Sequence, residues 1–336
     1  MEAKATEIKQ LVDDAQRIVI IMADNPDGDS VASALALESI LGDMGKDIFL
    51  YCGVDLMPNH FGYLPGWDRT NKDLPSKFDL SILVDCSVYR LLELLDKTGQ
   101  IGLVKSRPLI ALDHHDLESD LDFAKVIYND PNAVATGEVI YEIAKQLNWE
   151  LRLDAKNMIA VSILSDSLGL MTEATSARSI EIISELVRDG VKLHELEEAR
   201  RLLMKKSPDL LRYKGRLIER IEYYSDNRIA TVTIPWEEIE EFSHAYNPSM
   251  LVLDEMRFVE GVEVAIAFKV YNNGRITGKI RCNPGGPIAA ELARSFGGDG
   301  HKYASGFKIT DKQDFNSVKA ACIERATELL NQLHHA

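Results

Sequence analysis

Short apolar runs alternate with helical patterns through the first half of this 336-residue chain, and this alternation restricts the fold more than any other feature. Short strands that alternate with helices form a mostly parallel sheet with helices on both faces. In such a sheet, ligands bind at the carboxyl ends of the strands. The patterns predict strands at 17–23, 47–51, 80–85 and 108–112, and helices at 4–16, 30–43, 87–96, 136–147 and 154–165.

The pattern changes in the second half of the chain. Residues 176–223 have helical patterns rich in charge, which indicates a helical connector. Further on, alternating apolar runs are separated by polar turns, and Asn272-Asn273-Gly274 is a hairpin signal between two of them. We therefore predict an α/β protein with an N-terminal parallel-sheet domain at 1–190, a helical linker at 191–218 and a smaller mixed α/β domain at 219–336.

The charge balance disfavours one class of partner. The formal net charge of −15 at pH 7 argues against a broad basic face that could bind duplex nucleic acid without regard to sequence. A short nucleotide held by a few cations and metal ions remains compatible with this charge. The four scattered cysteines, the polar N-terminus and the absence of a run of about 20 apolar residues lead us to expect a cytoplasmic protein without a membrane partner.

Acidic and imidazole side chains follow several of the predicted strands and helices. One aspartate after a strand is usually a helix cap or a turn residue. Several carboxylates at one sheet edge would repel each other unless cations neutralised them. Oxygen and imidazole ligands without thiolate suit manganese or magnesium, with iron, cobalt or zinc as alternatives. The residues concerned are Asp27, Asp29, Asp85, Asp113-His114-His115-Asp116 and Asp166.

A glycine-rich turn near the C-terminus is a second candidate site. The stretch Gly297-Gly298-Asp299-Gly300-His301-Lys302 would let backbone amides approach a phosphate, and His301 and Lys302 could donate hydrogen bonds to it. Arg281, at the end of the strand predicted at 275–280, is another candidate anion ligand. Taken alone, such a turn is more often structural and such an arginine is more often solvated.

Together these motifs resemble those of the DHH phosphoesterase superfamily along nearly the whole chain. The two-domain length and the glycine-rich tail are most similar to the nanoRNase/pAp-phosphatase branch. Asn25-Pro26-Asp27-Gly28-Asp29 is similar to the first motif of the superfamily, and Asp85 with Arg90 is similar to the second. Asp113-His114-His115 is similar to the third motif, and Asp166 to the fourth. Gly297–Lys302 resembles the GGGH motif of the associated DHHA1 domain.

The resemblance implies a manganese-dependent hydrolase, with Mg²⁺ or Co²⁺ as alternative ions. A metal-activated water in the cleft between the domains would cleave short single-stranded oligonucleotides, dinucleotides or adenosine 3′,5′-bisphosphate. One ion would be held by Asp27 and Asp85, and the other by Asp29, Asp85, His114 and Asp166. His115, near the scissile phosphate, would act in catalysis with the bridging Asp85. The substrate would be bound by Arg281, Gly298, Gly300, His301 and Lys302.

One position departs from the family pattern. The family has a metal-binding histidine two residues before the asparagine of the first motif, and this chain has Ala23. Asp24 could replace it only by a backbone shift, because neighbouring side chains on a strand point to opposite faces. Nothing in the sequence places His60 near the site. We therefore expect a weaker first metal site, with one ion instead of two as an alternative.

The sequence is compatible with three alternatives. A nucleotide-binding protein without catalysis is the alternative to the enzyme, because the first metal site is incomplete. A pyrophosphatase or exopolyphosphatase is less favoured, because the pyrophosphatases of this superfamily carry a different C-terminal domain. The apolar positions of 180–187 could pack within the chain or across a homodimer.

Overall fold

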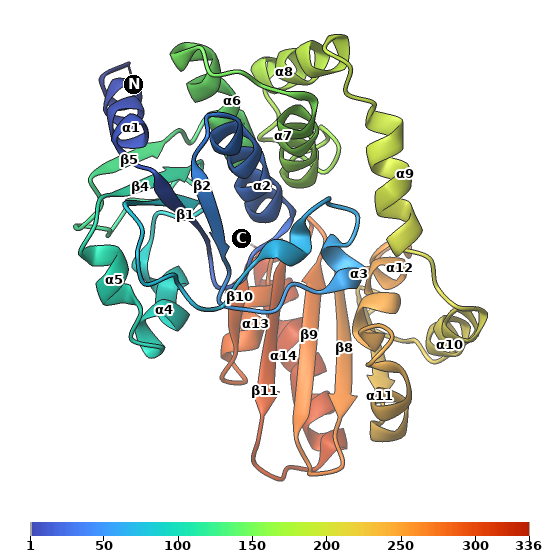
Figure 1. Cartoon of the computed structure of the whole chain (residues 1–336). Coiled ribbons are helices and arrows are strands. Elements are labelled where there is room, and N and C mark those ends of the chain that lie inside the picture. Colours follow the sequence, from blue (N-terminus) through green and yellow to red (C-terminus); the bar gives the residue numbers. More distant parts are fainter. Residues whose placement is uncertain (1, 336) are drawn as a thin grey trace. The chain divides into compact units, whose positions relative to one another are not determined.

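The computed structural model describes residues 2–335, with side chains described for residues 2–333. It divides the chain into two compact units, Met1–Lys205 and Lys206–Ala336 (Figure 1). The segment expected to be a linker is divided between them, since α9 (Leu193–Leu203) lies in the first unit and α10 (Pro208–Glu219) in the second.

The first unit contains a five-stranded parallel sheet, in the order β2-β1-β3-β4-β5. The four predicted strands are confirmed to within one residue at each end. The fifth strand was not predicted, because its four residues alternate only weakly and follow an irregular polar segment. The strands are β1 (Arg17–Met22), β2 (Asp47–Tyr51), β3 (Leu80–Val84), β4 (Leu109–Asp113) and β5 (Val126–Asn129).

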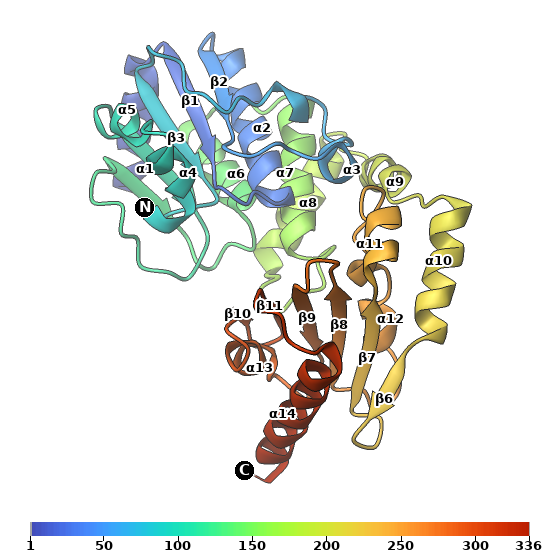
Figure 2. The same cartoon turned by 90° about the horizontal axis from the view of Figure 1, so that it is seen from below.

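Helices cover both faces of this sheet, which explains why its strands are apolar at nearly every position. In β1, Ile18 and Ile20 pack into the core formed with α1, α2, α6, α7 and α8, whereas Val19 and Ile21 pack against α4 and α5 (Figure 1; Figure 2). These helices are α1 (Glu2–Asp14), α2 (Gly28–Asp43), α4 (Glu93–Lys97), α5 (Ile101–Lys105), α6 (Thr136–Leu147), α7 (Leu153–Asp166) and α8 (Ala177–Arg188). The unit also contains α3 (Pro58–Phe61), η1 (Trp67–Arg69) and η2 (Tyr89–Leu92).

The second unit contains a six-stranded mixed sheet, in the order β10-β11-β9-β8-β7-β6. Only the β7–β8 pair is parallel among the described strand pairs of this sheet, and the predicted hairpin at Asn272–Gly274 joins β8 to β9. The strands are β6 (Glu222–Tyr224), β7 (Ile229–Ile234), β8 (Val264–Val270), β9 (Ile276–Cys282), β10 (Asp299–His301) and β11 (Ala304–Ile309).

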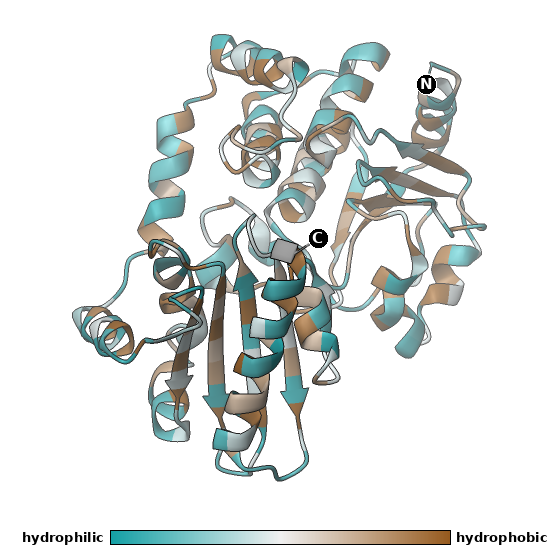
Figure 3. Ribbon diagram, turned by 180° about the vertical axis from the view of Figure 1, so that it is seen from behind, coloured by the Kyte–Doolittle hydropathy of each residue, from teal (hydrophilic) through white to brown (hydrophobic). Residues whose placement is uncertain are grey.

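Helices cover the two faces of the second sheet unequally. One face packs against α13 (Ala289–Arg294) and α14 (Phe315–His335), and Figure 3 shows α14 in front of the strands. On the other face, α10, α11 (Trp236–Phe242), η3 (Pro248–Leu251) and α12 (Leu253–Arg257) pack against β7 and β8. The side chains that β9 presents to this second face, from Thr277, Lys279 and Arg281, are only partly buried.

The helices of both units are too short or too polar to cross a bilayer, as far as the described residues extend.

Candidate metal centre

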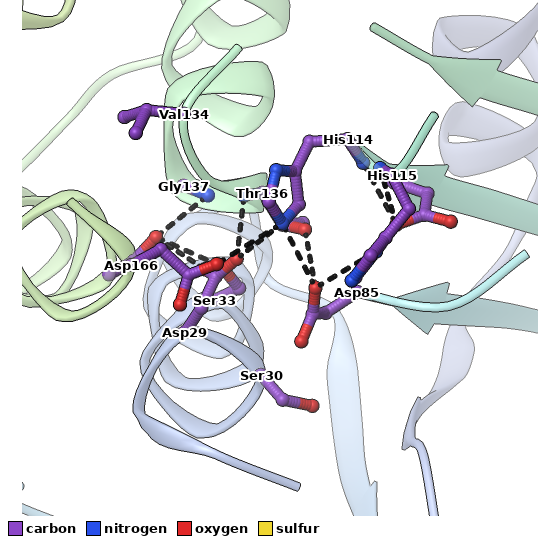
Figure 4. Close-up of polar contacts among 12 residues, drawn as sticks. Asp29, Ser30, Ser33, Asp85, His114, His115, Val134, Thr136, Gly137 and Asp166 are labelled. Atoms are coloured by element: carbon purple, nitrogen blue, oxygen red, sulfur yellow. Dashed lines mark hydrogen bonds and ion pairs between the residues drawn. The ribbon is translucent and has the colours of Figure 1, made fainter. Parts of the chain in front are cut away.

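Four segments bring acidic and imidazole groups together at the carboxyl edge of the parallel sheet (Figure 4). Because β1, β3 and β4 are neighbours, the residues that follow them meet at one edge. His114 Nε2 lies 3.5 Å from Asp29 Oδ2, 3.5 Å from Asp85 Oδ1 and 3.3 Å from Asp166 Oδ2. Asp29 comes from the start of α2, and Asp166 is the last residue of α7. The structure therefore gathers the four residues predicted to hold the second ion.

The tautomer of His114 makes this cluster suitable for a cation. Its Nδ1 lies 3.3 Å from the carbonyl oxygen of Ala133, which can only accept a hydrogen bond, so Nδ1 carries the hydrogen. The Nε2 lone pair then faces three carboxylates, and this buried atom has no hydrogen-bond partner in the described structure. Four electron-pair donors around one point are stable only with a cation between them. Nitrogen and oxygen donors of this kind fit a divalent metal ion.

In the metal-free chain, a proton takes the place of that cation. Burial alone would lower the pKa of His114, but the Asp166 and Asp85 carboxylates raise it to about 11. Burial, and to a lesser extent the charges of Asp29 and Asp27, raise the pKa of Asp85 to about 8. Perturbation of this kind is typical of a site that binds a metal or performs chemistry.

The backbone of Asp85 directs its carboxylate into the cluster. This residue follows β3 with a φ of 58°, in the left-handed region, and its N–H donates to the carbonyl oxygen of Leu112 at 2.9 Å. Asp adopts this conformation more readily than most residues, although it still costs about 1 kcal/mol or more. A strained backbone at this position is consistent with a functional role for the carboxylate.

A hydrogen-bond network holds Asp29 in a completely buried position. Its Oδ1 accepts from Ser33 Oγ at 2.9 Å and from Ser162 Oγ at 2.5 Å, and its Oδ2 accepts from the Thr136 N–H at 2.8 Å. Thr136 begins α6 and also donates from Oγ1 to Asp85 Oδ1 at 3.3 Å. Because each of these donors fixes one lone pair, the orientation of the carboxylate is set before any metal binds.

The sequence did not predict the roles of Ser33, Thr136 and Ser162. Hydroxyl residues within apolar helical patterns are common and carry no spacing signal. The one available signal is Gly137, near the start of a helix, where a Cβ would lie 2.1 Å from Ser162 Oγ. The absence of a side chain at Gly137 lets its N–H donate to Ser162 Oγ at 2.8 Å.

His115 lies beside the cluster with one ring nitrogen held in place. Its Nδ1 lies 2.8 Å from Asp113 Oδ1, and its side chain is 46% exposed. Burial would raise the pKa of Asp113, but the hydrogen bond from His115 and its other contacts lower it. The same hydrogen bond raises the pKa of His115. A protonated His115 therefore donates from Nδ1 to Asp113 and keeps Nε2–H available for a second acceptor.

Asp27 and the neighbourhood of Ala23 differ from the four-residue cluster. Asp27 is exposed and caps α2, accepting from the Ser30 N–H at 3.1 Å. It belongs to neither group of potential ligands found among the described residues, which are Asp29-His114-Asp166 and Asp85-His114-His115. Ala23 is buried in an apolar cluster, and the Asp24 carboxylate turns toward α4, accepting from the Leu94 N–H at 2.9 Å. His60 is exposed on α3.

The predicted substrate-binding residues lie at one edge of the second sheet. His301 of β10 is opposite Ala304 of β11, which is opposite Arg281 of β9, so His301 and Arg281 flank Ala304 on one face. Lys302 is exposed in the following turn. Gly298 and Gly300 allow β10 to approach β11 closely, since a Cβ at Gly298 would lie 2.2 Å from the carbonyl oxygen of Gly306.

The raised pKa of Asp85 predicts how the metal-free stability depends on pH. The folded chain keeps a proton on this carboxyl up to about pH 8, whereas the unfolded chain loses it near the ordinary value of 3.8. The folded state therefore binds more protons between these values, so this group destabilises the fold as pH rises, by up to about 1.4 kcal/mol per pH unit. We expect Asp85→Asn, which does not titrate, to gain stability relative to wild type between pH 5 and 8. Thermal melts in EDTA measure this difference, and a pH-independent difference would contradict the assignment.

Comparisons with known proteins identify the family and the fold. A model described as the DHH family, N-terminal domain, matches residues 17–174, and a DHHA1 domain model matches residues 247–328. The bifunctional oligoribonuclease and PAP phosphatase NrnA of Thermus thermophilus is 24% identical over 282 residues, which cover 84% of this chain and 81% of that protein. The protein of the same name from Bacillus subtilis is 22% identical over 320 residues, which cover 94% of this chain and 96% of that protein. A solved exopolyphosphatase-related protein from Bacteroides fragilis has the same fold, with a TM-score of 0.83 at 20% identity over 98% of each chain.

Proposed function

This chain belongs to the DHH family of phosphoesterases and carries a DHHA1 domain, and on that premise we propose that it is a metal-dependent hydrolase of short single-stranded oligonucleotides, dinucleotides or adenosine 3′,5′-bisphosphate. The observation that carries this proposal is the buried Nε2 of His114, which faces three carboxylates. The names of the NrnA relatives support the substrate class.

We assign the metal ligands from the donor groups of the cluster. Asp29, Asp85, His114 and Asp166 would hold a divalent ion, with Mn²⁺ favoured and Mg²⁺ or Co²⁺ as alternatives. Asp27 and Asp85 would hold a second ion more weakly, because Ala23 supplies no nitrogen ligand. When bound, such ions make a water more acidic and neutralise charge on a phosphoryl group.

The protein's own residues would position and protonate the substrate. With Nδ1 bonded to Asp113, His115 can donate from Nε2 to a phosphoryl oxygen, and this donation favours the more negative transition state. Thr136 keeps Asp29 and Asp85 oriented through its N–H and Oγ1. The terminal phosphate of the substrate would be bound by Arg281, His301 and Lys302, with Gly298 and Gly300 shaping the turn.

Ala23→His tests the cost of the missing ligand. We expect the variant to bind Mn²⁺ about tenfold more tightly and to hydrolyse a dinucleotide faster, because a nitrogen ligand is restored. The larger ring must enter the apolar cluster that contains Cys86 and Leu92, so stability should fall by about 1–3 kcal/mol. Ala23→Phe is the matched control, with similar packing cost and no ligand. Equal Mn²⁺ affinity in the two variants would show that position 23 does not face the metal.

The proposal is tested by hydrolysis of a dinucleotide and of adenosine 3′,5′-bisphosphate with Mn²⁺. We expect turnover in wild type, loss of turnover in EDTA and in Asp85→Ala, and no change in Asp96→Ala, which removes an exposed carboxylate of α4. Wild-type binding of the substrate without turnover would favour the second candidate, a nucleotide-binding protein. That candidate is favoured by Ala23, which supplies no nitrogen ligand to the metal site.

A further inference from the structure

A basic pocket of about 420 Å³ lies within the second unit, on the sheet face that carries Arg281. Three lysines line it, Lys269 of β8, Lys279 of β9 and Lys308 of β11. Among the described lining residues there is no aspartate or glutamate. Asn247, near the start of η3, also lines the pocket, as do Gly297 and Gly298. The pocket is thus a concave site whose charged groups are all cationic.

The strand register arranges these cations in successive rows. Lys269 is opposite Thr277, and Thr277 is opposite Lys308, so both lysines share one row and one face. Lys279 lies two residues further along β9 and projects from the same face, opposite Gly306, which contributes no side chain. The third row, two residues further again, contains Arg281. Successive rows are about 6.8 Å apart, because each residue of a strand advances the chain by about 3.4 Å.

The pocket lysines have no anionic partner in the part of the chain that the structure describes. Lys269 Nζ donates to Asn247 Oδ1 at 2.7 Å, and within residues 2–333 no ion pair is formed by Lys269, Lys279 or Lys308. Burial, and to a lesser extent Lys279, lowers the pKa of Lys269 to about 8. Burial and then Arg281 lower the pKa of Lys279 in the same way. Partly buried cations that repel each other would be stabilised by a bound anion.

Acidic residues near the rows do not neutralise this pocket. Asp299 is opposite Gly306 but is exposed and lies 3.5 Å from Arg294 Nε. Burial lowers the pKa of the Arg281 guanidinium, in the third row, and the negative charge of Asp254 partly offsets this effect. The uncompensated charge is therefore concentrated in the first two rows.

We propose that Lys269, Lys279 and Lys308 bind the terminal phosphate of a single-stranded trinucleotide, whose next phosphate then occupies the position at Arg281 and His301 that the terminal phosphate of a dinucleotide takes. The row spacing is close to the distance between consecutive phosphates of an extended single strand. This inference rests on the proposed function, and it names the substrate length that the site favours. A trinucleotide reaches the lysine pocket, whereas a dinucleotide or a nucleoside bisphosphate ends at Arg281 and His301.

Binding of 5′-phosphorylated ribo-oligonucleotides tests this inference directly. Asp85→Ala serves as the parent, so that no hydrolysis occurs during titration. We expect Lys269→Gln/Lys279→Gln in that parent to raise the Kd of a trinucleotide about tenfold, and the Kd of the dinucleotide by clearly less. The slope of log Kd against log salt for the trinucleotide should fall by roughly 0.7 for each phosphate that the variant no longer neutralises. Lys77→Gln is the control, because Lys77 is an exposed lysine before β3. It should change the Kd of neither the trinucleotide nor the dinucleotide.

The outcomes separate this inference from the proposed function. An equal loss of affinity for both lengths, no loss for either, or no binding of the trinucleotide by the parent would overturn the pocket assignment. Hydrolysis by wild type is measured separately on the dinucleotide. Absence of that hydrolysis together with a lysine-dependent trinucleotide affinity would overturn the proposed enzyme and leave the pocket supported.

Discussion

His114→Ala is expected to reduce Mn²⁺ affinity by at least about 100-fold and to remove hydrolysis at micromolar metal. Three carboxylates converge on the Nε2 of this residue, so the substitution removes the nitrogen at the centre of the cluster. A bound ion would then have one ligand fewer, and the remaining carboxylates around it would repel each other more strongly than in wild type. Metal titration by calorimetry and a dinucleotide assay measure both effects.

His60→Ala is the matched control for this experiment. It removes the same side chain from an exposed position on α3, outside both groups of potential ligands among the described residues. We expect unchanged metal affinity and turnover in this variant. If His114→Ala keeps wild-type metal affinity, or if both histidine variants lose it equally, the assignment of His114 as the central ligand is wrong.

Asp29→Ala is expected to destabilise the fold much more than Asp166→Ala, although both abolish metal-dependent activity. Asp29 accepts hydrogen bonds from Ser33, Ser162 and Thr136, and its removal leaves buried donors without an acceptor. Each unsatisfied donor costs about 1–3 kcal/mol. We therefore expect Asp29→Ala to be at least about 2 kcal/mol less stable than Asp166→Ala in EDTA.

The comparison of these two variants isolates the hydrogen-bond network. Both substitutions remove one negative charge from the cluster, so the relief of repulsion is similar and largely cancels. Asp166 is 25% exposed at the end of α7, and within residues 2–333 its carboxylate forms an ion pair with His114 alone. Chemical denaturation of the metal-free variants measures the difference. Equal free energies of unfolding would contradict the idea that Asp29 is held in place before the metal binds.

The sequence predicted most of the first sheet because its strands are apolar runs between long helical patterns. The observed β1 to β4 and the helices α1, α2, α6 and α7 all fall within or close to the predicted ranges. The predicted helix at 87–96 is wrong in extent, since η2 and α4 divide that segment and α5 follows. Helices of five residues contain little more than one turn, so their periodicity is too short to detect.

The candidate ligands were predictable because parallel strands end at one edge, which places Asp85 and His114 together once the topology is known. Their orientation was not predictable. The left-handed backbone of Asp85 and the hydrogen bonds of Thr136 depend on contacts between distant segments. The lysine rows could not be derived either, because the sequence does not reveal which strands lie on each side of β9.

The most direct test of metal-dependent hydrolysis by this chain is a titration of turnover with Mn²⁺, with bound metal counted per chain at each point. We expect at least one tightly bound ion per chain and hydrolysis of a 5′-phosphorylated dinucleotide that rises with occupancy, despite Ala23. Full occupancy without hydrolysis would contradict catalysis and leave a metal-dependent nucleotide-binding protein. No bound ion at millimolar Mn²⁺ would contradict the metal centre itself.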